Sequence, residues 1–281
     1  LSLGKLGDAY VVASETCAFD VVGAKFEREV KPGEIIVIDD EGLRSEVFAQ
    51  SSGRAICSME YIYFARQDSN VDEINVHKAR KNLGKQLALQ APIEADVVTG
   101  VPDSSISAAI GYAEQTGIPY ELGLIKNRYV GRTFIQPSQE LREQGVKMKL
   151  SAVRGVVEGK RVVMIDDSIV RGTTSRRIVR MLREAGATEV HVRISSPPIT
   201  NPCFYGIDTS TKEELIASSH SIEEMREMMG ADSLEFLSVE GMLEGIGRSN
   251  EDTNCGQCVA CFTGSYPTEI YPHTMHPHDK C

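Results

Sequence analysis

Residues 162–175 read Val-Val-Met-Ile-Asp-Asp-Ser-Ile-Val-Arg-Gly-Thr-Thr-Ser. Four apolar residues typical of a buried strand lead directly into Asp166 and Asp167, and a short turn then ends in Gly-Thr-Thr-Ser, where a helix is expected to begin. The free backbone N–H groups of such a helix start attract anions, and Gly172 allows an anion to approach the backbone closely. The stretch therefore predicts a phosphate site at residues 172–175 beside a pair of carboxylates.

The two aspartates lie where a sugar attached to that phosphate would be held. Carboxylates accept hydrogen bonds from ribose hydroxyls, and they also bind hard cations such as Mg²⁺. Two acids directly after four apolar strand residues would destabilise a core unless a ligand or a metal compensated them. A helix cap after an acidic turn is the structural alternative. We expect Asp166 and Asp167 to bind a ribose 5-phosphate together with Mg²⁺.

Charge and composition limit the classes of function. The 281 residues carry 30 Lys and Arg against 40 Asp and Glu, a net charge of −10, which argues against a nucleic-acid-binding domain that must neutralise many phosphates. Residues 126–177 reverse this balance, with twelve basic side chains against five acidic ones, which is typical either of a focused anion site or of a solvated basic face. Because the sequence has neither a long apolar run nor a signal-like start, we expect no membrane span and a cytoplasmic location.

Short apolar strands alternate with stretches of helical periodicity between residues 76 and 194. The pattern predicts helices at residues 76–89, 106–113 and 174–185, and strands at residues 96–101, 160–165 and 190–194. This alternation predicts an α/β fold, a parallel sheet flanked by helices, with its ligand site at the carboxyl edge of the strands. Residues 128–154 carry neither period, and a loop of this length is typical either of a functional lid or of a disordered segment, two states that it could adopt in turn.

Several segments resemble known families. Residues 162–175 resemble the phosphoribosyl pyrophosphate (PRPP) signature of type I phosphoribosyltransferases, and they lack the Gly-x-x-x-x-Gly-Lys pattern of a nucleotide triphosphatase. Residues 54–66, 100–113 and 120–137 together resemble the amidophosphoribosyltransferase family, and most of all its bacterial branch that carries an iron–sulfur cluster. The resemblance runs along the whole chain. It implies a type I phosphoribosyltransferase fold and the transfer of an amino group, from glutamine through ammonia, to PRPP, which gives 5-phosphoribosylamine and pyrophosphate in the first step of purine synthesis.

The resemblance also implies roles for individual residues. Those implied to bind PRPP are Lys126, Arg128, Arg132, Lys147, Asp166, Asp167, Arg171, Gly172, Thr173, Thr174 and Ser175. Among them, Lys126 and Arg128 would meet the pyrophosphate, and Arg132 and Lys147 would lie on the lid. Ser104 would join Asp166 and Asp167 around Mg²⁺. From the residues alone, Ser104 is more simply a helix cap, and the lid cations are as readily a solvated charge run.

The family pattern divides the chain into three parts. Residues 1–49 read as short strands separated by turns, and they resemble the end of the β-rich N-terminal nucleophile hydrolase domain that acts as glutaminase in this family. Residues 50–247 would form the phosphoribosyltransferase domain, and residues 248–281 a cysteine-containing segment that closes the iron–sulfur site. The sequence around Cys17 does not resemble the glutaminase nucleophile. We therefore expect Cys17 to be buried and structural, and the chain to carry out ammonia-dependent transfer at most.

Five cysteines are candidates for metal binding. Cys255, Cys258 and Cys261 form two overlapping C-x-x-C pairs, and Cys57 and Cys203 are distant in sequence. Spacing alone slightly favours zinc over an iron–sulfur cluster, and buried free thiols are the remaining alternative. The family resemblance instead implies a 4Fe-4S cluster held by Cys57, Cys203, Cys258 and Cys261, with Cys255 spare.

Other functions stay open from the sequence. The PRPP motif also fits a non-catalytic regulator that senses PRPP, a phosphoribosyltransferase acting on a nucleobase or an aromatic acid, and an iron–sulfur scaffold with a decayed transferase site. Net acidity disfavours the regulator, and the intact Asp166, Asp167 and residues 172–175 argue against decay. The family further implies a homotetramer inhibited by adenine and guanine nucleotides.

Overall fold

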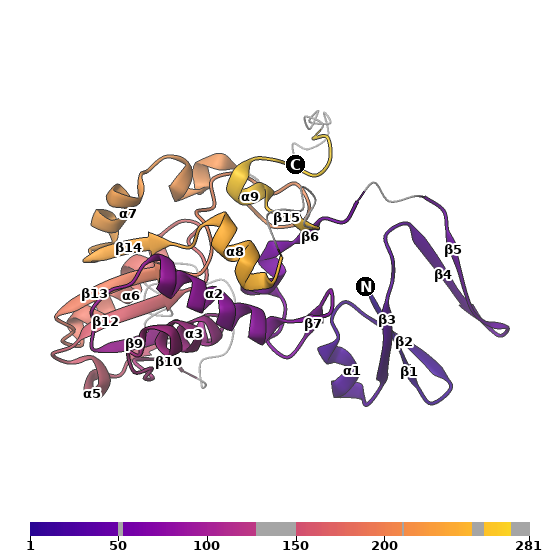
Figure 1. The fold of residues 1–281 in the computed structure, drawn as a ribbon, viewed down its shortest axis with the longest axis horizontal. Coiled ribbons are helices and arrows are strands. Elements are labelled where there is room, and N and C mark those ends of the chain that lie inside the picture. The colour runs from indigo at the N-terminus through magenta and orange to yellow at the C-terminus, as the bar shows by residue number, and fades with distance from the viewer. Residues whose placement is uncertain (50–52, 128–149, 210, 249–255, 271–281) are drawn as a thin grey trace, which may run out of the picture.

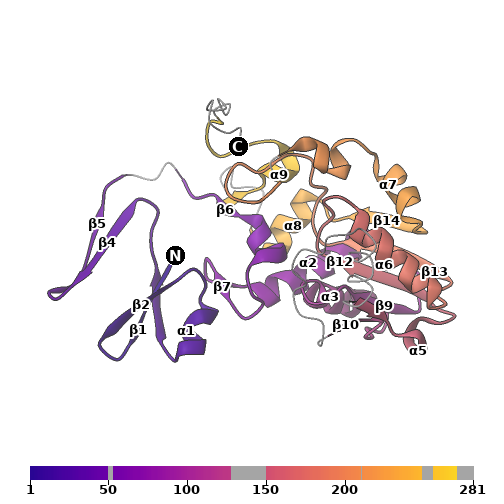
Figure 2. The same ribbon diagram turned by 180° about the vertical axis from the view of Figure 1, so that it is seen from behind.

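The structure, a computed structural model, describes residues 1–49, 53–127, 150–209, 211–248 and 256–270. A parallel α/β domain makes up most of these residues, and a smaller antiparallel unit at the N-terminal end lies to one side of it (Figure 1; Figure 2). No helix within these ranges combines the length and the apolar character needed to cross a lipid bilayer.

Four parallel strands form the central sheet. In pairing order they are β14 (Ser233–Phe236), β13 (Glu189–Ile194), β12 (Arg161–Asp166) and β9 (Val97–Gly100). Val163 and Ile165 of β12 belong to the apolar core on one face, and Val162 and Met164 belong to the core on the other face. A strand buried on both faces accounts for the unbroken apolar run before the two acids. The predicted parallel sheet is confirmed.

Helices cover both faces of this sheet. One core contains side chains of α2 (Val76–Gln90), α3 (Ile106–Thr116) and α8 (Val239–Ile246), and the other contains side chains of α6 (Thr173–Glu184) and α7 (Ile222–Met229). The three predicted helices therefore form, with ends that differ by a few residues. Glycines allow α2 and α3 to touch: a Cβ on Gly84 would lie 1.9 Å from the carbonyl oxygen of Ala108, and one on Gly111 would lie 1.9 Å from that of Lys81.

Short elements complete the domain. They are β6 (Ile56–Cys57), the π-helical turn η1 (Glu60–Phe64), β7 (Asn70–Val71), β8 (Ile74–Asn75), β10 (Leu124–Lys126), β11 (Leu150–Ala152), α5 (Arg154–Val157), η2 (Lys212–Glu214), η3 (Ile216–Ser218), β15 (Gln257–Cys258) and α9 (Ala260–Thr263). β15 pairs in parallel with β6, so the C-terminal part of the chain returns to the start of the domain (Figure 1).

Helices α7, α8 and α9 were not predicted. For α7 a readable signal existed, because Ser221 and Glu224 form a capping box at its start, and the Ser-x-x-Glu spacing is visible in the sequence. The short helix α9 (Ala260–Thr263) has only four residues, which are too few to give a periodic pattern in the sequence.

Residues 1–49 form the antiparallel unit. It consists of β1 (Ser2–Leu6), β2 (Ala9–Ala13), α1 (Cys17–Val22), β3 (Lys25–Glu29), β4 (Glu34–Asp39) and β5 (Gly42–Val47). β1 pairs with β2 and β3, and β4 and β5 form a separate hairpin. Leu3, Cys17 and Phe19 are buried, whereas Phe26 and several other apolar side chains are exposed. The expectations of short strands and of a buried Cys17 are confirmed.

Candidate functional site

The two acids lie at the carboxyl edge of the central sheet. β12 ends at Asp166, and Asp167 begins the connection to α6. Both side chains are buried, each residue being 7% exposed. The main-chain N–H of Asp167 donates to Asp166 Oδ1 at 3.0 Å, and Ser168 Oγ donates to Asp167 Oδ1 at 2.7 Å. The predicted pair is therefore a compact feature of the loop between a buried strand and a helix.

The neighbouring strand brings two serines to the acids. β9 pairs in parallel with β12, so the turn after β9, residues 101–105, reaches the same sheet edge. Ser104 Oγ donates to Asp167 Oδ2, and Ser105 Oγ donates to Asp166 Oδ1 at 3.2 Å. Ser104 thus lies beside the acids, as the resemblance implied. Ser105 was missed, although its place next to Ser104 in the same turn was a signal.

Burial makes both carboxylates costly to ionise. Burial raises the pKa of Asp166 well above its ordinary value, and the neighbouring Asp167 carboxylate raises it further. Burial also raises the pKa of Asp167, against the opposing effects of the hydrogen bonds from Ser104 and Ser168 and of the charge of Arg80. Two carboxylates and a hydroxyl form an all-oxygen donor set, which is the kind that Mg²⁺ prefers. A cation there would offset the desolvation of both acids.

The start of α6 leaves backbone donors unpaired within the helix. Gly172, the residue before α6, has φ 73°, a left-handed conformation that side-chain-bearing residues rarely adopt. Gly172 has no side chain with which to cap this helix, whereas α7 is capped by Ser221 and Glu224. The N–H groups of Thr173–Ser175 have no partner one turn earlier in the helix, so together with three hydroxyls they form a suitable site for a phosphate.

The predicted cations are only partly described. Lys126, at the end of β10, places Nζ 2.8 Å from Asp103 Oδ2, in the turn that carries Ser104. Arg171 forms an ion pair with Glu214, and both of these side chains are substantially exposed. The other three predicted cations lie outside the described residues: Arg128, Arg132 and Lys147. Most of the predicted lid lies outside them as well.

Four cysteines line one cavity, which we call the cysteine pocket. Its volume is about 520 Å³, and it is lined by Cys57, Cys203, Cys258 and Cys261 together with aromatic side chains that include Tyr266. Cys57 and Cys258 are partners in the β6–β15 pair, and Cys261 lies in α9. The structure thus brings together the four cysteines of the implied set. The fifth candidate, Cys255, lies outside the described residues.

The geometry of the cysteine pocket bears on which metal group it fits. Burial, together with the charge of the neighbouring cysteines, raises the pKa of Cys57 to about 11 and that of Cys261 to about 12. Within the described ranges, no group of three or more His, Cys, Asp or Glu side chains is placed to hold a metal ion. Zinc requires its thiolates within about 2.3 Å of one centre. The four thiols that line the pocket supply the all-sulfur donor set that a four-cysteine iron–sulfur cluster takes.

The chain is similar in sequence to known phosphoribosyltransferases. Residues 70–195 match the family described as the phosphoribosyl transferase domain. The chain is 79% identical over 280 residues to an amidophosphoribosyltransferase of Bacillus subtilis, covering 100% of this chain and 59% of the relative. An amidophosphoribosyltransferase of Archaeoglobus fulgidus is 55% identical over 270 residues, covering 96% of this chain and 59% of the relative. The chain therefore spans 59% of the length of each of these two curated relatives.

Solved structures show the same similarity. The glutamine PRPP amidotransferase of B. subtilis, complexed with ADP and GMP, matches with a TM-score of 0.91 and 78% identity, covering 99% of this chain and 61% of that chain. A second structure, described as the allosteric regulatory enzyme of purine biosynthesis, also matches with a TM-score of 0.91 and covers 99% of this chain and 60% of its own. The predicted parallel sheet flanked by helices is confirmed, and residues 70–195 within it match the phosphoribosyl transferase domain.

Proposed function

We propose that this chain performs the phosphoribosyl-transfer step of an amidophosphoribosyltransferase. In this reaction ammonia attacks the anomeric carbon of PRPP, pyrophosphate leaves, and 5-phosphoribosylamine forms, which is the first step of purine biosynthesis. The observation that carries the proposal is the placement of two buried carboxylates beside an uncapped helix start at one sheet edge. The high identity to amidophosphoribosyltransferases supports this reaction over the PRPP-sensing regulator and over transfer to a nucleobase.

Each part of the site has a proposed role that follows from its charge. The backbone N–H groups and hydroxyls of Thr173, Thr174 and Ser175 would bind the 5-phosphate, and Gly172 allows that approach. Asp166 and Asp167 would accept hydrogen bonds from the ribose hydroxyls and, with Ser104, hold Mg²⁺. When bound, Mg²⁺ would supply positive charge to the leaving pyrophosphate.

Cations would complete the neutralisation of the pyrophosphate. Lys126 is suited to this role because its ammonium group already lies against the turn that bears Ser104. Arg128 is proposed to act beside it, and Arg132 and Lys147 on a lid that excludes water while the sugar is cationic. Arg171, in the loop before α6, is proposed to bind substrate as well. In the described structure it pairs with Glu214, so this role requires exchange of an exposed ion pair.

The cysteine pocket is proposed to hold a 4Fe-4S cluster through Cys57, Cys203, Cys258 and Cys261, which would assign the protein to the cluster-containing branch. The support is the convergence on one cavity of four thiols from distant segments. The cluster would tie the start of the domain to the C-terminal segment and couple metal loading to folding. Its proposed role is structural.

The remaining proposals concern the complete protein. Residues 1–49 are proposed to belong to a glutamine-hydrolysing N-terminal nucleophile unit, residues 50–247 to the transferase domain, and residues 248–281 to the cluster segment. The antiparallel strands β1 to β5 are compatible with the first of these. Because a solved relative is complexed with ADP and GMP, we also propose that purine nucleotides regulate this protein. The homotetramer that the family resemblance implies is proposed as its assembly.

Incubation of the chain with PRPP, MgCl₂ and ammonium tests the transfer reaction. We expect ammonium-dependent release of pyrophosphate and formation of 5-phosphoribosylamine, followed by ³¹P NMR. Release that requires a nucleobase or an aromatic acid instead of ammonium would overturn the proposal. Absorbance spectra with iron and sulfide analysis of anaerobically purified protein test the cluster. A brown protein with iron and sulfide is expected, and a colourless zinc protein would contradict it.

A further inference from the structure

One glutamine side chain holds both ends of the turn that carries the two site serines. Gln67 lies in the loop between η1 and β7, outside the sheet edge where the acids lie. Its Nε2 donates to the main-chain oxygen of Asp103 at 2.8 Å, and its Oε1 accepts from Ser107 Oγ at 3.2 Å. Asp103 precedes Ser104 and Ser105, and Ser107 follows them in the first turn of α3. The amide of Gln67 therefore spans the segment whose two hydroxyls face the acids.

The acceptor side of this contact is itself held in place. Ser107 is 1% exposed, and its hydroxyl also lies 2.9 Å from Nδ1 of His77 on α2. Since the hydroxyl donates to Gln67, it accepts from the imidazole N–H. Gln67 is thus fixed at a buried hydroxyl on one side, and its amide N–H defines the position of the Asp103 carbonyl on the other.

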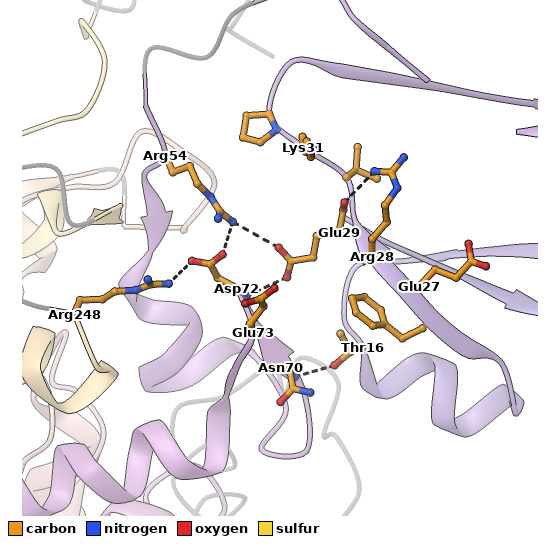
Figure 3. A pocket seen from close by; sticks show the side chains of 13 residues that line it. Thr16, Glu27, Arg28, Glu29, Lys31, Arg54, Asn70, Asp72, Glu73 and Arg248 are labelled. Atoms are coloured by element: carbon orange, nitrogen blue, oxygen red, sulfur yellow. Dashed lines mark hydrogen bonds and ion pairs between the residues drawn. The ribbon is translucent and has the colours of Figure 1, made fainter. Parts of the chain in front are cut away.

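The loop that carries Gln67 is held from the opposite side by the N-terminal unit. Glu15 Oε2 accepts from the main-chain N–H of Arg66 and from Ser69 Oγ, each at 2.8 Å. Thr16 Oγ1 accepts from the N–H of Asn70 at 2.8 Å, a contact visible in Figure 3. These hydrogen bonds flank Gln67 on both sides in the sequence. The loop is therefore clamped between the N-terminal unit and the serine-bearing turn.

Ion pairs extend the same contact beyond the loop. Asp72, whose side chain is 13% exposed, pairs with Arg54 and with Arg248. Its main-chain N–H donates to Glu29 Oε1 of the N-terminal unit at 3.0 Å, and Arg54 also reaches Glu29 at 3.7 Å (Figure 3). The strength of such partly buried ion pairs depends on how well the charged groups are aligned with their partners. It fixes the turn of the β7–β8 hairpin, whose first strand follows directly after the Gln67 loop.

We propose that Gln67 is a positioning residue for the transferase site, and that Glu15 sets the position of its loop. The contact of the N-terminal unit is then transmitted through Glu15 and Gln67 to the turn of Ser104 and Ser105. Gln67 acts through that turn and not on the substrate. The inference rests on the proposed function, because it assigns a consequence to the position of the serines beside the acids.

Gln67→Ala in the full chain tests the inference, with Gln90→Ala as the matched control. Gln90 makes an equivalent pair of contacts: its Nε2 donates to the Phe236 oxygen at 3.0 Å, and its Oε1 accepts from the Ser238 N–H at 2.9 Å. Neither contact involves the serine-bearing turn. In ammonium-dependent turnover, we expect Gln67→Ala to raise the KM for PRPP about tenfold with a smaller change in kcat, and Gln90→Ala to leave both near wild type.

Two further variants separate positioning from packing. Gln67→Glu keeps the acceptor for Ser107 but loses the donor to the Asp103 carbonyl, so we expect it to raise the KM as Gln67→Ala does. Glu15→Ala should raise the KM about threefold, because it acts one step further away. Hydrogen exchange measured by mass spectrometry supplies a readout without substrate. Amides of residues 101–107 should exchange faster in Gln67→Ala and not in Gln90→Ala.

The outcomes distinguish the inference from the proposed function. If the KM or the exchange of residues 101–107 in Gln67→Ala equals that of Gln90→Ala, the role of Gln67 is wrong and the transfer reaction stands. A wild-type KM in Gln67→Glu also overturns it, because the donated hydrogen bond is then irrelevant. If the wild-type chain releases no pyrophosphate from PRPP with ammonium, the proposed function fails first, and the role of Gln67 fails with it.

Discussion

The acid pair and the cysteine pocket are assembled in opposite ways. The acids and the helix start that is proposed to bind phosphate come from one continuous stretch, residues 162–175, and the serines come from the turn after the neighbouring strand of the same sheet. The pocket gathers Cys57, Cys203, Cys258 and Cys261 from segments that are far apart in the chain. A site made within one strand–loop–helix unit depends on local geometry, whereas a site made across the chain depends on the whole fold. Changes at the acids should therefore affect function first, and changes at the pocket should affect stability first.

Removing the charge of both acids should give the largest effect. We expect Asp166→Asn with Asp167→Asn to lower kcat/KM for PRPP by about a hundredfold or more, the effect of removing a charge-stabilising group from an active site. The thermal midpoint should not fall, because both carboxylates are buried and their pKa values are raised by that burial. Pyrophosphate release and thermal melting measure the two effects. Wild-type turnover in the double variant would contradict the claim that changes at the acid pair affect function first.

Loss of one pocket cysteine should reverse that pattern. Cys57→Ala is expected to remove iron and sulfide from the purified protein and to lower the thermal midpoint by about 5–10 °C, since several kcal/mol of metal-linked folding free energy are lost. Cys17→Ala is the control, because Cys17 is buried outside the pocket at 4% exposure. Iron analysis and calorimetry follow both variants. Full iron content in Cys57→Ala would show that this cysteine is not a ligand.

Gly172→Ala should have an intermediate effect on PRPP binding, because Gly172 lies at the helix start beside the acid pair and not at the cysteine pocket. Its φ of 73° disfavours any side chain by about 1–2 kcal/mol, and a Cβ there would lie 3.0 Å from Ile216 Cδ1. Gly230→Ala matches the backbone cost, because Gly230 also has φ 73°, and a Cβ there would meet no atom of a described, non-neighbouring residue within 4 Å. Both variants should melt slightly earlier, but only Gly172→Ala should raise the KM for PRPP. Equal KM values would remove the phosphate role from this helix start.

The smallest expected effect is a pH-dependent change in stability at the Asp96–Arg161 ion pair, which belongs neither to the acid pair nor to the cysteine pocket. Hydrogen bonds from the Arg161 guanidinium and its main-chain N–H lower the pKa of Asp96 from 3.8 to about 2. Because the folded pKa lies below the unfolded one, the stabilisation is present above pH 3.8 and is lost as the pH falls toward 2. The thermal midpoint of Asp96→Asn should thus lie below that of wild type at about pH 6, and the difference should shrink at low pH. A constant difference would contradict the assigned cause.

The same contrast explains what could be predicted from the sequence. Asp166, Asp167 and residues 172–175 were readable because strand, acids and helix start are contiguous, and β12 with α6 followed from their periodicity. Ser105 and Gln67 were not found, because their partners lie far away in the sequence and depend on strand pairing. For the cysteines, spacing offered two overlapping C-x-x-C pairs and favoured zinc. The family resemblance supplied the set that the fold gathers around one cavity.

The pairing of β15 with β6 has a consequence for the order of synthesis. Ile56 and Cys57 leave the ribosome long before Gln257 and Cys258, their only partners in this two-stranded sheet of the described structure. The central sheet and its acids can be folded before β15 has been synthesised, while β6 still lacks its pairing strand. A nascent chain would therefore pass through a stage with a formed acid pair and an open, thiol-bearing pocket, and loading of the proposed cluster would be among the last events of its maturation.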